Sequence, residues 1–205
     1  RVLFRSRLMK KVFIINGENI DFDLDKYTHL RAYHGARCLD ESTYLRDGIH
    51  TFDRATLVDY VKNICHIAGV NEQDIMDVFD EKYEDTDDAP PKVWLSGTEE
   101  SLLDGAGHYL IYGSEFVISL FAEAFHNFDV LKTVGVPTIF VCDIPIEDIG
   151  KRMWLPSIVD AIRRGDTNIG FPVYRVLPED IVGIEHPTDI VDPYTQLMYH
   201  YNGKK

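Results

Sequence analysis

The pentapeptide Tyr33-His34-Gly35-Ala36-Arg37 combines residue types that suit the binding of a polar ligand. An imidazole can donate or accept a hydrogen bond at either ring nitrogen, so His34 suits a sugar hydroxyl. A glycine carries no side chain, so the backbone of Gly35 can approach a planar carboxamide closely. The same two residues are also typical of a structural histidine beside a turn glycine, and this alternative stays open.

A second group of chemically useful residues lies between Tyr109 and Glu115. Either Tyr109 or Tyr112 can stack on a planar ring while its hydroxyl stays free. Because side chains alternate along a strand, we expect only one of these two tyrosines to line a pocket. Ser114 is placed to cap the following helix, and Glu115 would complement the helix dipole in its first turn.

Hydrophobic periodicity predicts the elements that position these residues. The expected strands cover residues 12–16, 27–33, 93–95, 109–112, 137–142, 172–176 and 181–184. The expected helices cover residues 41–47, 54–68, 71–83, 98–103, 115–125 and 156–164. This order lacks regular βαβ alternation and therefore predicts an α+β fold, with His34-Gly35 at the end of its strand. No G-x-G-x-x-G or G-x-x-x-x-G-K-[ST] sequence occurs, so neither a Rossmann nor a P-loop phosphate site is predicted.

Length and charge limit the classes of function. The chain has 205 residues, of which 45% are hydrophobic, so it can bury a sizeable core. Its formal charge of −13 repels phosphate backbones and anionic lipids at long range, which argues against a general nucleic-acid or membrane-surface binder. A local basic patch could still hold one strand or one nucleotide.

The ends of the chain and its cysteines carry further expectations. Residues 1–8 look unrelated to the rest and Met9 resembles a natural start, so we expect a cloning remnant followed by one domain over 9–205. Cys38, Cys65 and Cys142 are widely spaced without a CxxC pattern, which indicates neither a metal site nor a disulfide framework. No apolar run reaches the roughly 18 residues of a membrane helix, and we expect a cytoplasmic protein.

The order of these motifs resembles the ADP-ribosyltransferase superfamily, in particular the His-Tyr-Glu branch that includes diphtheria-toxin-like and poly(ADP-ribose)-polymerase-like enzymes. In that family a hydrophobic-His-Gly-small sequence ends the first core strand, and residues 33–36 stand in its place here. The central tyrosine of the family precedes a helix, and Tyr109 is the best match, with Tyr112 second. Residues 138–145 and 176–184 resemble the closing strands of bacterial members, so the resemblance covers residues 28–186.

The resemblance implies a split antiparallel sheet with flanking helices, and NAD as a substrate without any metal. The Gly35 backbone would hold the carboxamide, His34 a ribose hydroxyl, and Arg31 or Arg37 the pyrophosphate. The residues expected to contact NAD are Arg31, His34, Gly35, Ala36, Arg37 and Tyr109. The residues expected to act in catalysis are His34, Tyr109, Tyr112 and Glu115.

The sequence departs from the family at its third catalytic residue. The glutamate of the family opens the penultimate strand, where this chain has Ile169, Gly170 and Phe171. The nearest acidic residues are Asp166, Glu179 and Glu115, and none of them matches the family position. The residue that fills this role therefore stays open.

Three functions follow from these observations. The leading one is a bacterial toxin or phage-defence ADP-ribosyltransferase that modifies a protein, DNA or RNA acceptor and has a cognate inhibitor or antitoxin protein. The second is a non-catalytic binding module of the same fold, which docks a basic partner on the acidic tract 77–88. The third is a hydrolase that uses Ser114 with His108 or His126, and it ranks last because no G-x-S-x-G sequence surrounds Ser114.

Overall fold

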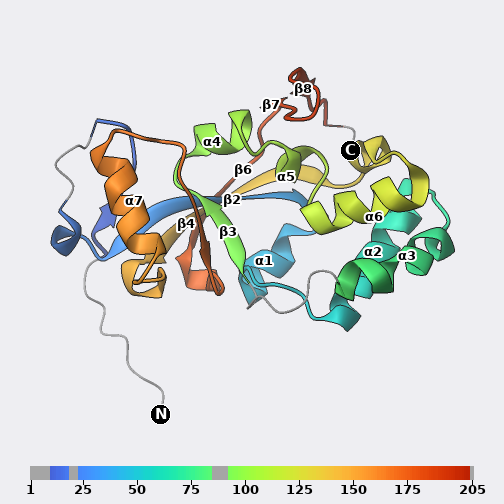
Figure 1. The fold of residues 1–205 in the computed structure, drawn as a ribbon, viewed down its shortest axis with the longest axis horizontal. Coiled ribbons are helices and arrows are strands. Elements are labelled where there is room, and N and C mark those ends of the chain that lie inside the picture. Colours follow the sequence, from blue (N-terminus) through green and yellow to red (C-terminus); the bar gives the residue numbers. More distant parts are fainter. Residues whose placement is uncertain (1–9, 19–22, 85–91, 204–205) are drawn as a thin grey trace, which may run out of the picture.

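A computed structural model of the chain describes residues 10–18, 23–84 and 92–203. The predictions for residues 1–8 and for the end of the acidic tract after Glu84 lie outside these residues. The protein has an α+β fold in which an antiparallel sheet is flanked by helices, as the order of its elements predicts (Figure 1).

Two long strands form the centre of the sheet. β2 (His29–Cys38) and β4 (Val136–Pro145) pair antiparallel over all ten residues of each strand. β6 (Ile181–Glu185) follows on the outer side of β4, with a β-bulge between Val141 and Cys142 of β4. All eight residues of β4 from Thr138 to Pro145 are buried. This burial fits the strongly apolar sequence of β4 and its position between two strands.

Shorter strands line the other edge of β2. The two residues of β1 (Val12–Phe13) pair parallel with the start of β2. β3 (Val93–Ser96) pairs antiparallel with β5 (Gly170–Val173) over four residue pairs. The full order is β5-β3-β2-β4-β6, with β1 beside β2.

Helices cover both faces of the sheet and create two hydrophobic cores. The first core holds Leu30 and Ala32 of β2 with Ile158 and Ile162 of one long helix, α7 (Trp154–Arg163). The second core holds Ile139 of β4 and the apolar faces of the remaining long helices. The helices of the first core are α1 (Glu41–Asp47) and α7 (Trp154–Arg163). The helices of the second core are α2 (Arg54–Ala68), α3 (Glu72–Glu84), α4 (Glu99–Asp104), α5 (His108–Ile111) and α6 (Glu115–Phe125).

Side-chain caps explain why several helices begin where the sequence predicts. The side chains of Asp40, Asp53, Thr98 and Ser114 each accept a hydrogen bond from a backbone N–H in the first turn of α1, α2, α4 and α6. Gly69 ends α2 in the left-handed conformation at φ 69°, a position that favours glycine.

Two sequence-based expectations are wrong. Residues 109–112 do not form a strand, since α5 occupies His108–Ile111. In a short apolar run, periodicity does not distinguish a strand from a buried helix. Leu110 and Ile111 are both fully buried, so their segment shows no polar face. His34-Gly35 does not end its strand either, because β4 provides partners for β2 as far as Cys38.

A small hairpin near the C-terminus was not predicted. β7 (Asp189–Val191) and β8 (Met198–His200) form a separate two-stranded sheet above the second core (Figure 1). Ile190 is its fully buried anchor in that core. Its strands are only three residues long, too short for a reliable period-2 signal.

Candidate functional site

The sheet separates between β2 and β3, directly at the His-Gly pair. These two strands are joined by one residue pair, Tyr33 opposite Ser96, whereas β3 continues along β5. His34 and Gly35 therefore lie on the edge of β2 where its pairing with β3 has ended. We refer to this place as the β2–β3 split.

The imidazole of His34 spans the split. Its Nδ1 lies 3.0 Å from the carbonyl oxygen of Trp94 in β3. Because a carbonyl oxygen only accepts, Nδ1 carries the proton and Nε2 is the acceptor of the neutral ring. Burial beside the first core lowers the pKa of His34 although the bond to Trp94 opposes that effect, so the ring is neutral at pH 7.

The hydrogen-bond pattern leaves the backbone of Gly35 directed into the split. The Trp94 carbonyl faces β2, in keeping with its β5 partner Pro172, which has no N–H to donate. Ser96, two residues later, faces β2 in the same way and bonds with Tyr33. Hydrogen-bonding directions alternate along a strand, so Gly35 directs its N–H and C=O toward β3, as Tyr33 does. Gly35 lies two residues beyond Tyr33, the β2 residue that pairs with β3.

The helices above Gly35 leave little room for a side chain at this position. A Cβ on Gly35 would lie 3.1 Å from Leu102 Cδ2 of α4 and 3.4 Å from Leu110 Cδ2 of α5. That face of β2 is therefore closed, and Gly35 itself is buried, so a ligand would have to approach along the strand edge. Ala36 packs against the first core on the opposite face.

Trp94 is an aromatic residue of the split that belongs to none of the sequence motifs above. Continuing the register of Tyr33 with Ser96 by two residues places Trp94 opposite Gly35. Its side chain is 46% exposed and contacts Trp154 of α7 edge-on, with ring centroids 5.5 Å apart. The alternation with buried Val93 and Leu95 was the sequence signal for an outward-facing ring.

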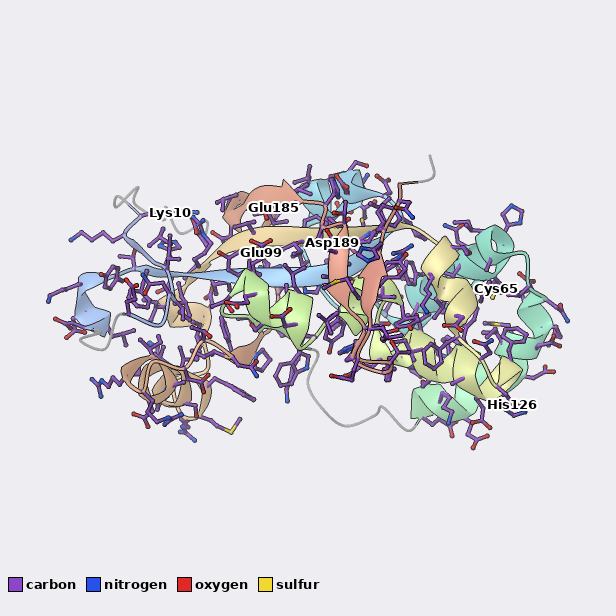
Figure 2. The ribbon with its side chains drawn as sticks, turned by 90° about the horizontal axis from the view of Figure 1, so that it is seen from above. Lys10, Cys65, Glu99, His126, Glu185 and Asp189 are labelled. Carbon is purple, nitrogen blue, oxygen red and sulfur yellow. The ribbon has the colours of Figure 1, made fainter. Side chains whose placement is uncertain are left out.

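Two carboxyl groups meet near Tyr33, and neither was among the predicted site residues. Glu99 in the first turn of α4 and Glu185 at the end of β6 lie on the same side of the sheet (Figure 2). Burial raises the pKa of Glu99, and the neighbouring Glu185 carboxyl raises it further. Burial also raises the pKa of Tyr33, and the two glutamates add to that effect while Arg31 opposes it. The two acids come from elements far apart in the sequence, so spacing alone could not pair them.

Both arginines that the sequence assigned to a pyrophosphate are engaged within the protein. The Nε of Arg31 donates to Oδ1 of Asp143 at 2.6 Å across the β2–β4 pair. Asp143 is buried and the Arg31 side chain is only partly exposed, so this ion pair is largely withdrawn from solvent. Arg31 is held by a buried acid and not directed toward the split.

Arg37 is more completely enclosed. Its side chain donates to the carbonyl oxygens of Val134 at 2.7 Å, of Leu110 at 3.3 Å and of Lys132, and to the hydroxyl of Tyr199 at 3.4 Å. The residue is only 4% exposed. Four of its five N–H groups are thus directed at acceptors of the protein, and its role here is structural.

The two candidate tyrosines lie away from His34. Tyr112 is 2% exposed, and its hydroxyl donates to Oδ2 of Asp192 at 2.7 Å. Burial raises the pKa of Tyr112 to about 12, which keeps that donor protonated. Tyr109 stacks on His108 at 4.0 Å in the same helix. Both belong to the side of the second core, whereas the His34 ring packs beside Phe140 of the first core, so the sheet separates them.

The remaining candidates have structural surroundings. Glu115 is exposed and lies 3.6 Å from Nε2 of His108. The hydroxyl of Ser114 accepts from Val117 N as the cap of α6, while His126 stands at the other end of that helix. An 11-residue helix is about 16 Å long, so Ser114 and His126 cannot form a catalytic pair.

The other acidic candidates for the third catalytic role are also accounted for. Oδ1 of Asp166 accepts from the backbone of Asn168. Glu179 is exposed beside Lys10, on the short turn before β6. Within the described ranges, no three His, Cys, Asp or Glu side chains are grouped so that they could hold a metal ion.

Comparisons with protein-family models, curated protein sequences and solved structures found no match to this chain. Across the part of the chain that the structure describes, every helix is too short or too polar to cross a membrane. The geometry of the site therefore carries the functional argument.

Proposed function

We propose that the protein binds NAD in the β2–β3 split and transfers its ADP-ribose to a macromolecular acceptor. The observation that carries this proposal is the edge of β2 at Gly35, which the β2–β3 pairing does not reach, beside a neutral His34. A primary carboxamide has one acceptor and one N–H₂ donor, and it complements the N–H and C=O of one extended residue. This is the pairing that the resemblance to ADP-ribosyltransferases implies for Gly35.

The orientation of His34 supports the same ligand. Its Nδ1–H is used by the Trp94 carbonyl, so the free Nε2 accepts a hydrogen bond. A ribose hydroxyl is a suitable donor for that nitrogen. In this proposal Trp94 provides the ring that stacks on nicotinamide, in place of Tyr109 or Tyr112.

The transfer breaks the bond between ribose C1 and the nicotinamide nitrogen. Nicotinamide leaves neutral with the electron pair of that bond, and the ribose develops positive charge. A carboxylate would stabilise this charge, but Glu99 and Glu185 lie with Tyr33 on the second-core side of the sheet, opposite the His34 ring, so we assign this role to neither. A nucleophilic oxygen or nitrogen of the acceptor then bonds to C1 and releases its proton to the solvent.

Transfer of label from NAD tests this proposal. The full chain is incubated with adenine-labelled NAD and bacterial lysate, and labelled macromolecules are separated. We expect transfer by the wild type and by His66→Ala, a change of an exposed histidine at the end of α2. His34→Ala is expected to lose activity about 100-fold, since it removes a positioned ribose contact.

Thermal unfolding without NAD shows whether the variants remain folded. Equal transfer by folded His34→Ala and wild type would overturn the assignment of the β2–β3 split. Absence of transfer together with consumption of NAD by wild type would identify a hydrolase of the same bond.

A binding module remains the second candidate because exposed acidic residues line α3. Asp74, Asp77, Asp80 and Glu81 are all exposed on that helix, although Asp80 pairs with Arg54. An inhibitor or other basic protein could dock there by charge complementarity. NAD distinguishes the two functions, because a ligand of the native state at about 100 times its Kd stabilises the protein by about 2.7 kcal/mol. No thermal shift at millimolar NAD would favour the binding module.

A further inference from the structure

The surface of α7 and its flanking segments is locally basic in an otherwise acidic chain. Residues 151–175 include five cations against the acids Asp160 and Asp166. All five cations are exposed: Lys151, Arg152, Arg163, Arg164 and Arg175. The chain as a whole carries a net charge of −13, so the charge of this segment is opposite in sign to that of the chain.

These cations also differ from other arginines in their partners. Arg31, Arg46 and Arg54 each pair with an aspartate. Among the ion pairs of the described residues, none involves a cation of the 151–175 segment. Four arginines therefore remain available for an anionic ligand, and a guanidinium matches phosphate oxygens in a bidentate way.

A cavity of about 150 Å³ opens along α7, between the cations that precede the helix and those at its end; its lining includes none of the five cations. It lies between α7 and the residues that lead into β5. Its polar and aromatic lining comes from Trp154, Ser157 and Asn168, and its apolar lining from Ile158, Ala161 and Ile169. An engineered apolar cavity of about 150 Å³ accepts benzene, so this volume suits one planar ring.

The cavity lining can recognise the edge of a heteroaromatic ring. The hydroxyl of Ser157 donates to Met153 O at 2.8 Å, which leaves its oxygen free to accept. The exposed amide of Asn168 can donate and accept. Ser157 and Arg164 are seven residues apart, so they lie on one face of α7, with Asp160 between them.

Exposed aromatic side chains continue from this cavity. The indole of Trp154 contacts Trp94, and Trp94 is 46% exposed. Tyr174, just after β5, is 69% exposed. Aromatic faces next to arginines are the usual surface for stacked bases and their phosphates.

We propose that this surface binds a single strand of nucleic acid, with one base in the cavity beside Trp154. A neighbouring base stacks on Trp94, and the phosphates contact Arg163, Arg164 and the other cations of residues 151–175. The net charge of the chain does not prevent this contact, because exposed charges more than about 8 Å away are largely screened at physiological salt. A duplex binds less well, since its bases are not free to enter the cavity or to stack.

Binding of a labelled oligonucleotide to the full chain tests this proposal without NAD, so its result is independent of the proposed function. Anisotropy is measured with a mixed-sequence 12-nucleotide DNA, the same RNA sequence and the DNA duplex. We expect Arg163→Gln with Arg164→Gln to weaken strand binding about 10-fold or more and to reduce the salt slope by about 1.4. Trp94→Ala is expected to weaken it about 10-fold, the loss of one stacked base.

The matched control is Arg46→Gln with Arg54→Gln, which removes the same charge from two exposed arginines elsewhere. Equal loss from this control pair would overturn the proposal, as would no strand binding by wild type at 50 mM salt. Equal affinity for the duplex would exclude recognition of free bases. Displacement of the strand by polyglutamate at equal charge concentration would show a general polyanion surface and overturn it as well.

Discussion

His34 and Arg37 are three residues apart in β2, yet the structure gives them opposite environments. His34 faces the β2–β3 split with one ring nitrogen free to accept a hydrogen bond. Arg37 lies near the end of the same strand and is surrounded by carbonyl oxygens. The difference follows from the neighbours of β2: β3 diverges beside His34, whereas α5, the turn after α6 and β8 enclose Arg37.

This contrast shows that a basic side chain close to a ligand motif is not thereby part of the site. Arg37 satisfies backbone acceptors that would otherwise be buried without donors. The closed region consists of Arg37, Tyr112, Asp192, Lys132 and Tyr199. The open region consists of His34 and Gly35, at the edge of β2 where β3 separates from it. The His34 ring is held there by one hydrogen bond, to the Trp94 carbonyl.

The largest expected effect is on stability, from the closed region. Arg37→Met removes the donors for three carbonyl oxygens and leaves them buried, so we expect a loss of about 3–5 kcal/mol in the free energy of unfolding. Urea denaturation measures this loss. Arg46→Met, at an exposed arginine, should change it by less than about 1 kcal/mol. A similar small change at Arg37 would contradict its structural role.

Tyr112→Phe makes a smaller change in the same region. It removes the 2.7 Å hydrogen bond to Asp192, which is 3% exposed, and should cost about 1–2 kcal/mol. The control is Tyr174→Phe at an exposed tyrosine. If Tyr112→Phe is as stable as wild type but loses NAD-dependent transfer, Tyr112 belongs to the site and the contrast between the two regions fails.

The pH dependence of stability tests the open region. Burial lowers the pKa of His34, so folding favours the neutral ring. The stabilising contribution is complete above the ordinary histidine pKa of about 6.5 and is lost as the pH falls toward the lower folded-state value. Urea denaturation at pH 7.5 and 5.5 should show a smaller pH effect for His34→Asn than for wild type. Equal pH effects would mean that the ring is solvated in the native protein.

The smallest expected effect concerns Glu99 and Glu185. The pKa of Glu99 is raised by burial and by Glu185, so its contribution to stability is present below the ordinary glutamate value and is lost as the pH rises through the folded-state pKa. Glu99→Gln removes the repulsion and should stabilise the protein at pH 7.5 by a few tenths of a kcal/mol. In the same variant, NAD-dependent transfer should be unchanged, because the sheet separates Glu99 from His34. A destabilised variant would indicate that Glu99 is held by favourable contacts instead.

Local sequence signals predicted most of the elements. The helices begin directly after their caps Asp53, Thr98 and Ser114, because the cap and the apolar period agree at each site. The strand predicted at 109–112 failed because burial on all sides removes the periodicity that separates helix from strand. The candidate site was predicted only at His34 and Gly35. Trp94 was missed because its place opposite Gly35 depends on strand order.

The sequence by itself determined the α+β class, the helix caps and the glycine that lets the backbone at position 35 be approached. These features depend on contacts within a few residues, which spacing and propensity describe. Only the tertiary structure decided that Arg31 and Arg37 bond within the protein and that the sheet separates His34 from Tyr109 and Tyr112. Those outcomes depend on which strands pair and where pairing ends, and such long-range contacts are not encoded in any local pattern.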